Sequence, residues 1–121
     1  MKMRNDRFFK NKHLPFAELR YSQCSKVSFK PHMHRALSVG VVEKGKVLYT
    51  INGKKATLAP GSLVIMNPEV LHTCNPANDD ERSYYMLHLD THWCLRVQQS
   101  LWKISLFAAP EKNRIDDLPL Y

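Results

Sequence analysis

The sequence has no long apolar run and no secretory signal, and both absences exclude a class of protein. No stretch approaches the about 18 consecutive apolar residues that a membrane-spanning helix needs. The N-terminus is basic, but no continuous apolar segment follows it, as a secretory signal would require. We therefore expect a cytoplasmic protein with no membrane partner.

Cysteines are also few, and their number argues against a disulfide framework. Cys24, Cys74 and Cys94 are the only 3 cysteines, so they cannot all pair within one chain, and their spacing matches no zinc pattern. Reduced thiols are the ordinary state of cysteines in the cytoplasm. We expect the fold to be held by its core alone, which a chain of 121 residues is long enough to bury.

Acidic residues are scarce in the first half of the chain. Residues 1–55 carry a net charge of +10, whereas residues 56–121 carry −3. A basic half can face nucleic acid, an acidic partner or only water. No helix-turn-helix, basic helix or zinc-finger pattern accompanies the charge, so we interpret it as scattered surface lysines.

Short strand-like runs fill most of the chain. Asn52–Gly53 between two of them is a strong signal for a tight hairpin. Close spacing and frequent turns predict one all-β domain, a closed barrel or sandwich. The predicted strands are Phe16–Tyr21, Lys26–Phe29, Leu37–Glu43, Lys46–Ile51, Lys54–Leu58, Ser62–Met66, Val70–Asn75 and Tyr84–Asp90.

The pattern changes after Asp90, where apolar residues recur at helical spacing. Trp93, Val97 and Leu101 predict one helix of about a dozen residues that packs on the barrel, with Asp90 or Thr91 as its N-cap. Trp102 widens the apolar stripe. The predicted divisions are a basic tail (1–14), the barrel domain (15–109, with a short last strand over Ser105–Ala109) and the start of a linker (110–121).

Histidines provide the main candidate site. His32 and His34 are two residues apart, so on a strand both imidazoles lie on one face, which Ser38 shares if the strand continues. A later strand can return His72 to this pair, and Cys74 has the same parity as His72. Such imidazoles can bind a small molecule by hydrogen bonds, hold a divalent metal, or fill the core without function.

The arrangement of these residues resembles a known family. Pro31-His32-Met33-His34 followed by Glu43-Lys44-Gly45 resembles the first cupin motif, and Gly61 through Pro68 to His72 resembles the second. With the closing strand Tyr85–Asp90, residues 16–107 are most similar to the N-terminal sensor domain of AraC-type transcriptional regulators. The resemblance implies a double-stranded β-helix, the cupin or jelly-roll barrel, with one C-terminal helix.

It further implies a bacterial effector-binding domain that dimerises, contacts DNA only through a domain absent from this chain, and is not an enzyme. Ser38 stands where a metal cupin carries a glutamate ligand, which favours an effector over a metal and predicts no cofactor. The candidate ligand-binding residues are His32, His34, Ser38, His72, Cys74, Met86 and His88. The alternative is a metal-dependent cupin enzyme with His32, His34 and His72 as metal ligands.

Overall fold

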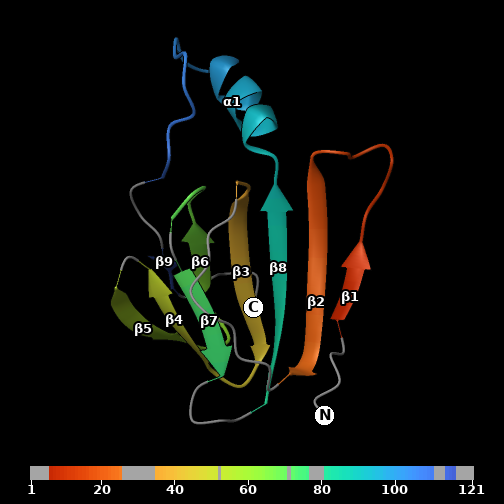
Figure 1. The fold of residues 1–121 in the computed structure, drawn as a ribbon, viewed down its shortest axis with the longest axis vertical. Coiled ribbons are helices and arrows are strands. Elements are labelled where there is room, and N and C mark those ends of the chain that lie inside the picture. The colour runs from red at the N-terminus through yellow and green to blue at the C-terminus, as the bar shows by residue number, and fades with distance from the viewer. Residues whose placement is uncertain are drawn as a thin grey trace.

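The computed structural model describes residues 6–25, 35–51, 53–70, 72–76, 81–110 and 114–116. Strands dominate these residues, and one helix follows the eighth strand (Figure 1). The elements are β1 (Asp6–Phe9), β2 (Ala17–Ser25), β3 (Leu37–Lys44), β4 (Val47–Ile51), β5 (Lys54–Leu58), β6 (Leu63–Met66), β7 (His72–Pro76), β8 (Arg82–Leu89), α1 (Thr91–Gln99) and β9 (Arg114–Ile115).

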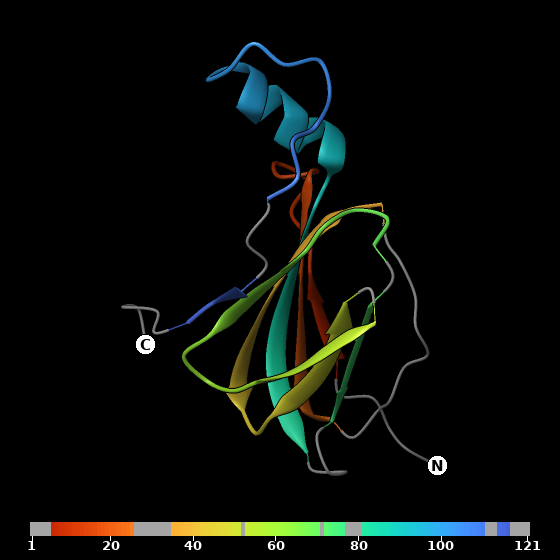
Figure 2. The same ribbon diagram turned by 90° about the vertical axis from the view of Figure 1, so that its left-hand side faces the viewer.

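The strands form two antiparallel sheets that face each other (Figure 2). The larger sheet has the order β1-β2-β8-β3-β6-β9, and the smaller one has the order β5-β4-β7. Between β3 and β8 the chain crosses from one sheet to the other after β3, β5, β6 and β7. This topology is the double-stranded β-helix that the sequence predicts.

Side-chain alternation puts one face of each sheet in the interior. Along β3, Ser38, Gly40 and Val42 are buried, whereas the intervening Val39 and Val41 are only partly buried. A pleated strand produces this pattern because successive side chains point to opposite faces. Apolar residues from both sheets meet between them in one cluster: Val42, Val47, Tyr49, Leu58, Val64, Met66, Tyr84 and Met86.

Two glycines make the turns that carry the chain between strands. Gly53 has a φ of 79° between β4 and β5, which pair as a tight hairpin with Ile51 opposite Lys54. This confirms the predicted hairpin, although Asn52 lies outside the described residues. Gly45 has a φ of 77°, and a Cβ there would stand 2.5 Å from the Glu81 carbonyl oxygen. Gly45 therefore permits both the turn and the close approach of the backbone before β8.

The helix is shorter than the sequence predicts. It ends at Gln99, so Leu101 and Trp102 lie beyond it and are exposed, and the prediction that they pack against the barrel is wrong. Asp90 is the N-cap, and its Oδ2 accepts the Trp93 backbone N–H at 2.9 Å. The Trp93 ring stacks on Phe16 at 4.2 Å, which packs the first turn of α1 onto the chain just before β2.

The residues after the helix contain no strand where one was predicted. Ser105–Ala109 is irregular, and Gln98 holds it by exchanging two hydrogen bonds of 2.9 Å with the backbone of Ala108. These two bonds satisfy backbone groups of Ala108 that a neighbouring strand would otherwise pair.

Among the described residues, the helix is too short and too polar to cross a membrane.

Both ends of the described chain contribute strands to the larger sheet. β1 pairs with β2, so the prediction of a tail over residues 1–14 is wrong for Asp6–Phe9. β9 pairs with β6 at the opposite edge, inside the segment predicted as a linker. Three exposed residues and one partly buried residue, with two phenylalanines among them, give little strand signal by themselves, and the strand is defined by its pairing with β2.

Candidate functional site

The inner face of the larger sheet consists of three rows of side chains across β3, β8 and β2. Antiparallel register places Val42, Tyr84 and Ser22 in the first row. Gly40, Met86 and Arg20 form the second, and Ser38, His88 and Glu18 form the third. Residues directly opposite each other lie on the same face of a sheet. The polarity of this face therefore increases from the first row to the third.

Ser38 and His88 form a polar pair in the third row, in which Ser38 is buried and His88 is partly buried. The Ser38 hydroxyl lies 2.8 Å from Nδ1 of His88, and Ser38 is only 1% exposed. A hydroxyl and an imidazole each hold donor and acceptor capacity, which suits such groups to contact the polar atoms of a small molecule. The sequence predicted both residues as ligand contacts, and the structure shows that they contact each other.

His72 lies on the facing sheet, at the start of β7. It is opposite Ile51 of β4, is 5% exposed, and its Nδ1 lies 2.9 Å from the Val70 carbonyl oxygen. Because a carbonyl only accepts, Nδ1 carries the proton, and a neutral ring then has its lone pair on Nε2. The backbone thus fixes both the tautomer and the orientation of this imidazole.

The other predicted residues have different outcomes. Met86 is buried in the apolar cluster beside Gly40, where an added Cβ would approach its Cε to 3.2 Å. Cys74 takes the register position opposite Tyr49, but its side chain is not among the described parts. His32 and His34 lie outside the described residues, so the three-histidine arrangement stays a prediction.

The β3 and β8 residues of the first two rows meet the smaller sheet in a nearly filled region, which we call the closed end. Val42, Val47, Leu58, Val64 and Tyr84 line it, together with Gly40, Val41 and Met86, and they leave a void of only about 10 Å³. This space is too small for an effector. A small molecule between the sheets therefore belongs toward the third row.

Two arginines that the sequence did not single out surround Tyr84. The Arg20 guanidinium carbon lies 5.6 Å from the Tyr84 ring centroid, and that of Arg82 lies 4.9 Å away. Arg20 also donates from Nη2 to the Tyr84 hydroxyl at 3.4 Å, while Arg82 is fully buried. Alternation along β2 was the available signal, because Glu18, Arg20 and Ser22 share one face.

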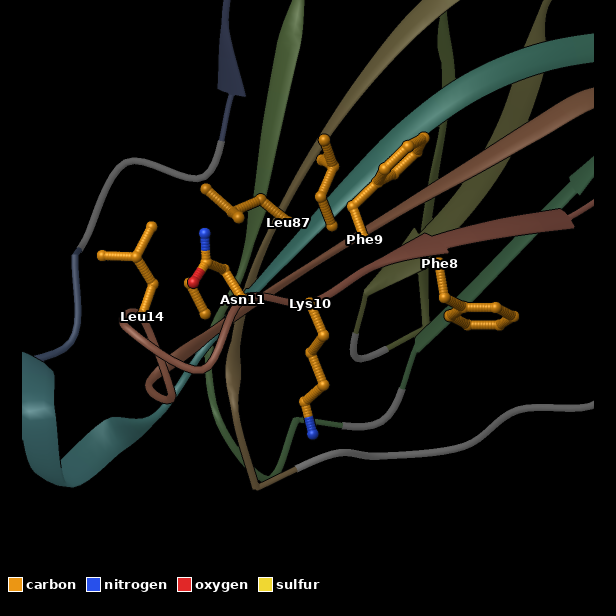
Figure 3. A pocket seen from close by; sticks show the side chains of 8 residues that line it. Phe8, Phe9, Lys10, Asn11, Leu14 and Leu87 are labelled. Carbon is orange, nitrogen blue, oxygen red and sulfur yellow. The ribbon is translucent and has the colours of Figure 1, made fainter.

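Alternation along β2, without the sheet pairing, does not show which face of the strand is the inner one. On β2 the apolar residues Ala17 and Leu19 lie on the outer face, where they line a groove of about 520 Å³. Figure 3 shows Phe9, Leu14 and Leu87 around this groove, with Lys10 at its side. The groove is on the opposite side of the larger sheet from the Ser38–His88 pair, so it is not part of the predicted site.

A third hollow of about 380 Å³ lies near the start of α1. The Thr91 hydroxyl donates to the Arg35 carbonyl oxygen there, which connects the helix to the chain before β3. Its lining residues are Arg35, Pro68, Glu69, Thr91, Phe107 and Ala109.

Among the described residues, no three histidine, cysteine or acidic side chains come together as a metal site.

Solved structures with the same fold are numerous. A cupin 2 conserved barrel domain protein from Salinispora arenicola matches with a TM-score of 0.63 at 15% identity, over 80% of this chain and 84% of that one. A cupin-like protein from Thermotoga maritima has a TM-score of 0.63 at 21% identity, over 72% and 68% of the two chains.

An RmlC-like cupin from Methanocaldococcus jannaschii with a double-stranded β-helix fold has a TM-score of 0.62 at 12% identity, over 74% and 83%. Identities this low establish the fold alone. No curated protein sequence matches the chain. The model of the AraC-like ligand binding domain, however, matches residues 15–106, which include β2 to β8 and α1. The chain belongs to the family of AraC-like ligand binding domains.

Proposed function

We propose that this chain is the small-molecule sensing domain of a bacterial AraC-type transcription regulator. Its effector binds between the two sheets, at the polar third row. Ser38, His72, Met86 and His88 contact it, and His32, His34 and Cys74 complete the set predicted from the sequence. The family match supports ligand binding, and the position of the polar pair supports this location.

The Ser38–His88 pair is the observation that carries the proposal. A buried hydroxyl and a partly buried imidazole beside an apolar cluster form a small set of fixed polar groups next to apolar walls. Ligand sites commonly have this composition, because apolar walls supply affinity while the few polar groups set orientation. An inert core would gain more from apolar residues at these positions.

The regulatory part of the proposal rests on the family. The domain is proposed to act in the cytoplasm as a homodimer, without catalysis, and to reach DNA only through a second domain outside this chain. A ligand that binds the native domain and changes its dimer contacts would shift the population of DNA-binding states.

Thermal denaturation with a library of small metabolites tests the effector site. A ligand present at 100 times its Kd stabilises a native domain by about 2.7 kcal/mol, which raises the Tm by several degrees. The stabilising compound should lose affinity in Ser38→Ala and keep it in Ser105→Ala, an exposed serine beyond the helix. A library without any stabilising compound, or equal affinity in both variants, contradicts the proposal.

His72 supports a second candidate, a metal-dependent cupin enzyme with His32, His34 and His72 as ligands. Metal-bound histidines commonly donate their other ring N–H to a backbone carbonyl, as Nδ1 of His72 does to Val70. Elemental analysis of protein purified without metal-affinity resin, before and after addition of Zn²⁺, Ni²⁺, Mn²⁺ or Fe²⁺, tests this candidate. Stoichiometric metal that is lost in His72→Ala would favour it, and its absence would eliminate it.

A further inference from the structure

We propose that the effector carries a carboxylate and that Arg20, at the β2 end of the second row, binds this group. The inference rests on the proposed effector site and adds the chemical class of its ligand. It follows from the position of Arg20, from its lack of an acidic partner and from the apolar groups around it.

Arg20 lies on the inner face of the larger sheet. Its register partners are Met86 on β8 and Phe8 on β1. Met86 belongs to the buried cluster, whereas Phe8 is 61% exposed, so Arg20 stands where the covered part of this face ends. Arg20 is itself partly exposed. A molecule that enters between the sheets from the β1 side can therefore reach the guanidinium group.

The charge of Arg20 is not balanced by any described acid. Its one hydrogen bond within the described residues goes to the Tyr84 hydroxyl, and its Nε is buried without an acceptor. Glu18, two residues away on the same face, pairs with Lys10 at 3.7 Å. An arginine that is partly withdrawn from water without a carboxylate loses solvation and gains no ion pair. A carboxylate on the ligand would supply that missing partner.

The surroundings of Arg20 also define the rest of the ligand. The guanidinium groups of both arginines lie over the Tyr84 ring. The same ring forms an apolar wall together with Met86. The positive charge of Arg20 beside this ring attracts negative charge to this position. A planar carboxylate matches the fork of a single guanidinium, whereas a phosphate has more oxygens to satisfy than this position offers. We therefore expect a monocarboxylate on an apolar body.

The distance to the polar pair limits the size of that body. Arg20 and His88 are on neighbouring strands and two residues apart along the sheet, which corresponds to about 7 Å along the strand direction. A single aromatic ring or a short aliphatic chain spans this distance. Such an acid can place its carboxylate at Arg20 and its other end near Ser38 and His88.

Matched acids and amides provide the test. Binding of benzoate, phenylacetate and hexanoate is compared by titration calorimetry with that of benzamide, phenylacetamide and hexanamide, on the wild-type chain. At least one acid should bind at least tenfold more tightly than its amide. Arg20→Gln should remove that preference, because charge-assisted hydrogen bonds are about twice as strong as neutral ones. Arg7→Gln is the control, since Arg7 is opposite Tyr21 on the outer face.

Each outcome is informative for both proposals. Stabilisation by neutral metabolites, with acids no better than amides, overturns the carboxylate inference and leaves the sensing function standing. Equal acid affinity in Arg20→Gln and wild type overturns it as well. If neither the acids nor the wider metabolite library binds, both proposals fail. The comparison of acid with amide on the wild-type chain remains decisive even if Arg20→Gln does not fold.

Discussion

The two ends of the barrel interior have opposite chemistry, although the same strands build both. At the closed end, Val42, Leu58 and Val64 pack so tightly that only about 10 Å³ stays empty. Four residues back along β3, Ser38 instead joins His88 in a hydrogen bond. The proposed effector site therefore lies only a few residues along one strand from the tightly packed closed end. Substitutions at the closed end should cost stability, and those at the polar end should mainly cost binding.

Leu58→Ala should have the largest effect on stability. Leu58 is 2% exposed, and its truncation leaves a cavity between the sheets, for which a loss of about 3 kcal/mol is typical. Chemical denaturation followed by circular dichroism measures the free energy of unfolding. Leu48→Ala is the control, because Leu48 lies on the exposed face of neighbouring β4. Equal losses in the two variants would contradict a closed end that dominates stability.

Gly45→Ala should be the next most damaging change. The substitution forces a Cβ into a backbone with φ of 77° and within 2.5 Å of the Glu81 carbonyl oxygen, at a cost of about 2 kcal/mol or more. Gly53→Ala shares the positive φ but has nothing within 4 Å of the added Cβ, so about 1 kcal/mol is expected. The difference in their Tm values isolates the close contact. If Gly53→Ala is the worse variant, this account of the turn is wrong.

Ser38→Ala tests the polar end directly. It leaves the His88 ring without its serine partner, which should lower the free energy of unfolding by about 1 kcal/mol. The same variant should weaken effector binding by tenfold or more, whereas Leu58→Ala should leave affinity nearly unchanged in the folded fraction. Calorimetric titration of both variants with the identified effector makes the comparison. A larger binding loss in Leu58→Ala would remove the distinction between the two ends.

The smallest expected effect concerns Cys94, on the first turns of α1. Burial, and then the negative charge of Asp90, raise the pKa of its thiol above the ordinary value. In a Cys24→Ser/Cys74→Ser background, Cys94 should react with a thiol reagent at pH 8 more slowly than the unfolded chain. Its contribution to stability is present below the ordinary thiol pKa and decreases as pH rises through the elevated one. Reaction as fast as in urea would contradict this burial.

Local patterns predicted β2 to β8, because alternation and glycine position depend on adjacent residues, whereas β1 and β9 were not predicted. The hairpin at Gly53 and the cap at Asp90 belong to the features that such patterns reveal. The predicted strand Lys26–Phe29 lies outside the described residues. The helix was overestimated, since Leu101 and Trp102 continue an apolar spacing that the backbone does not follow. Periodicity alone does not record where a helix loses its packing surface.

Contacts that depend on strand register could not be predicted from local sequence patterns. Ser38 and His88 are 50 residues apart, and only the pairing of β3 with β8 places them in one row. The sequence did not single out Arg20, because alternation alone would assign the apolar residues of its strand, Ala17 and Leu19, to the interior. In the sheet the reverse holds, since the polar side faces the interior.

The short strand β9 has a practical consequence for where this domain can be cut. Its backbone pairs with β6 in the larger sheet, while Nη1 of Arg114 donates to the Thr57 carbonyl oxygen of the smaller sheet at 2.9 Å. Nearby, the Ser62 hydroxyl donates to Asp116. An expression boundary at residue 109, where the sequence predicts the domain to end, would remove β9 and these hydrogen bonds. The edge of β6 would then be exposed to pairing with other chains. Fragments intended for crystallisation should therefore extend at least through Asp116.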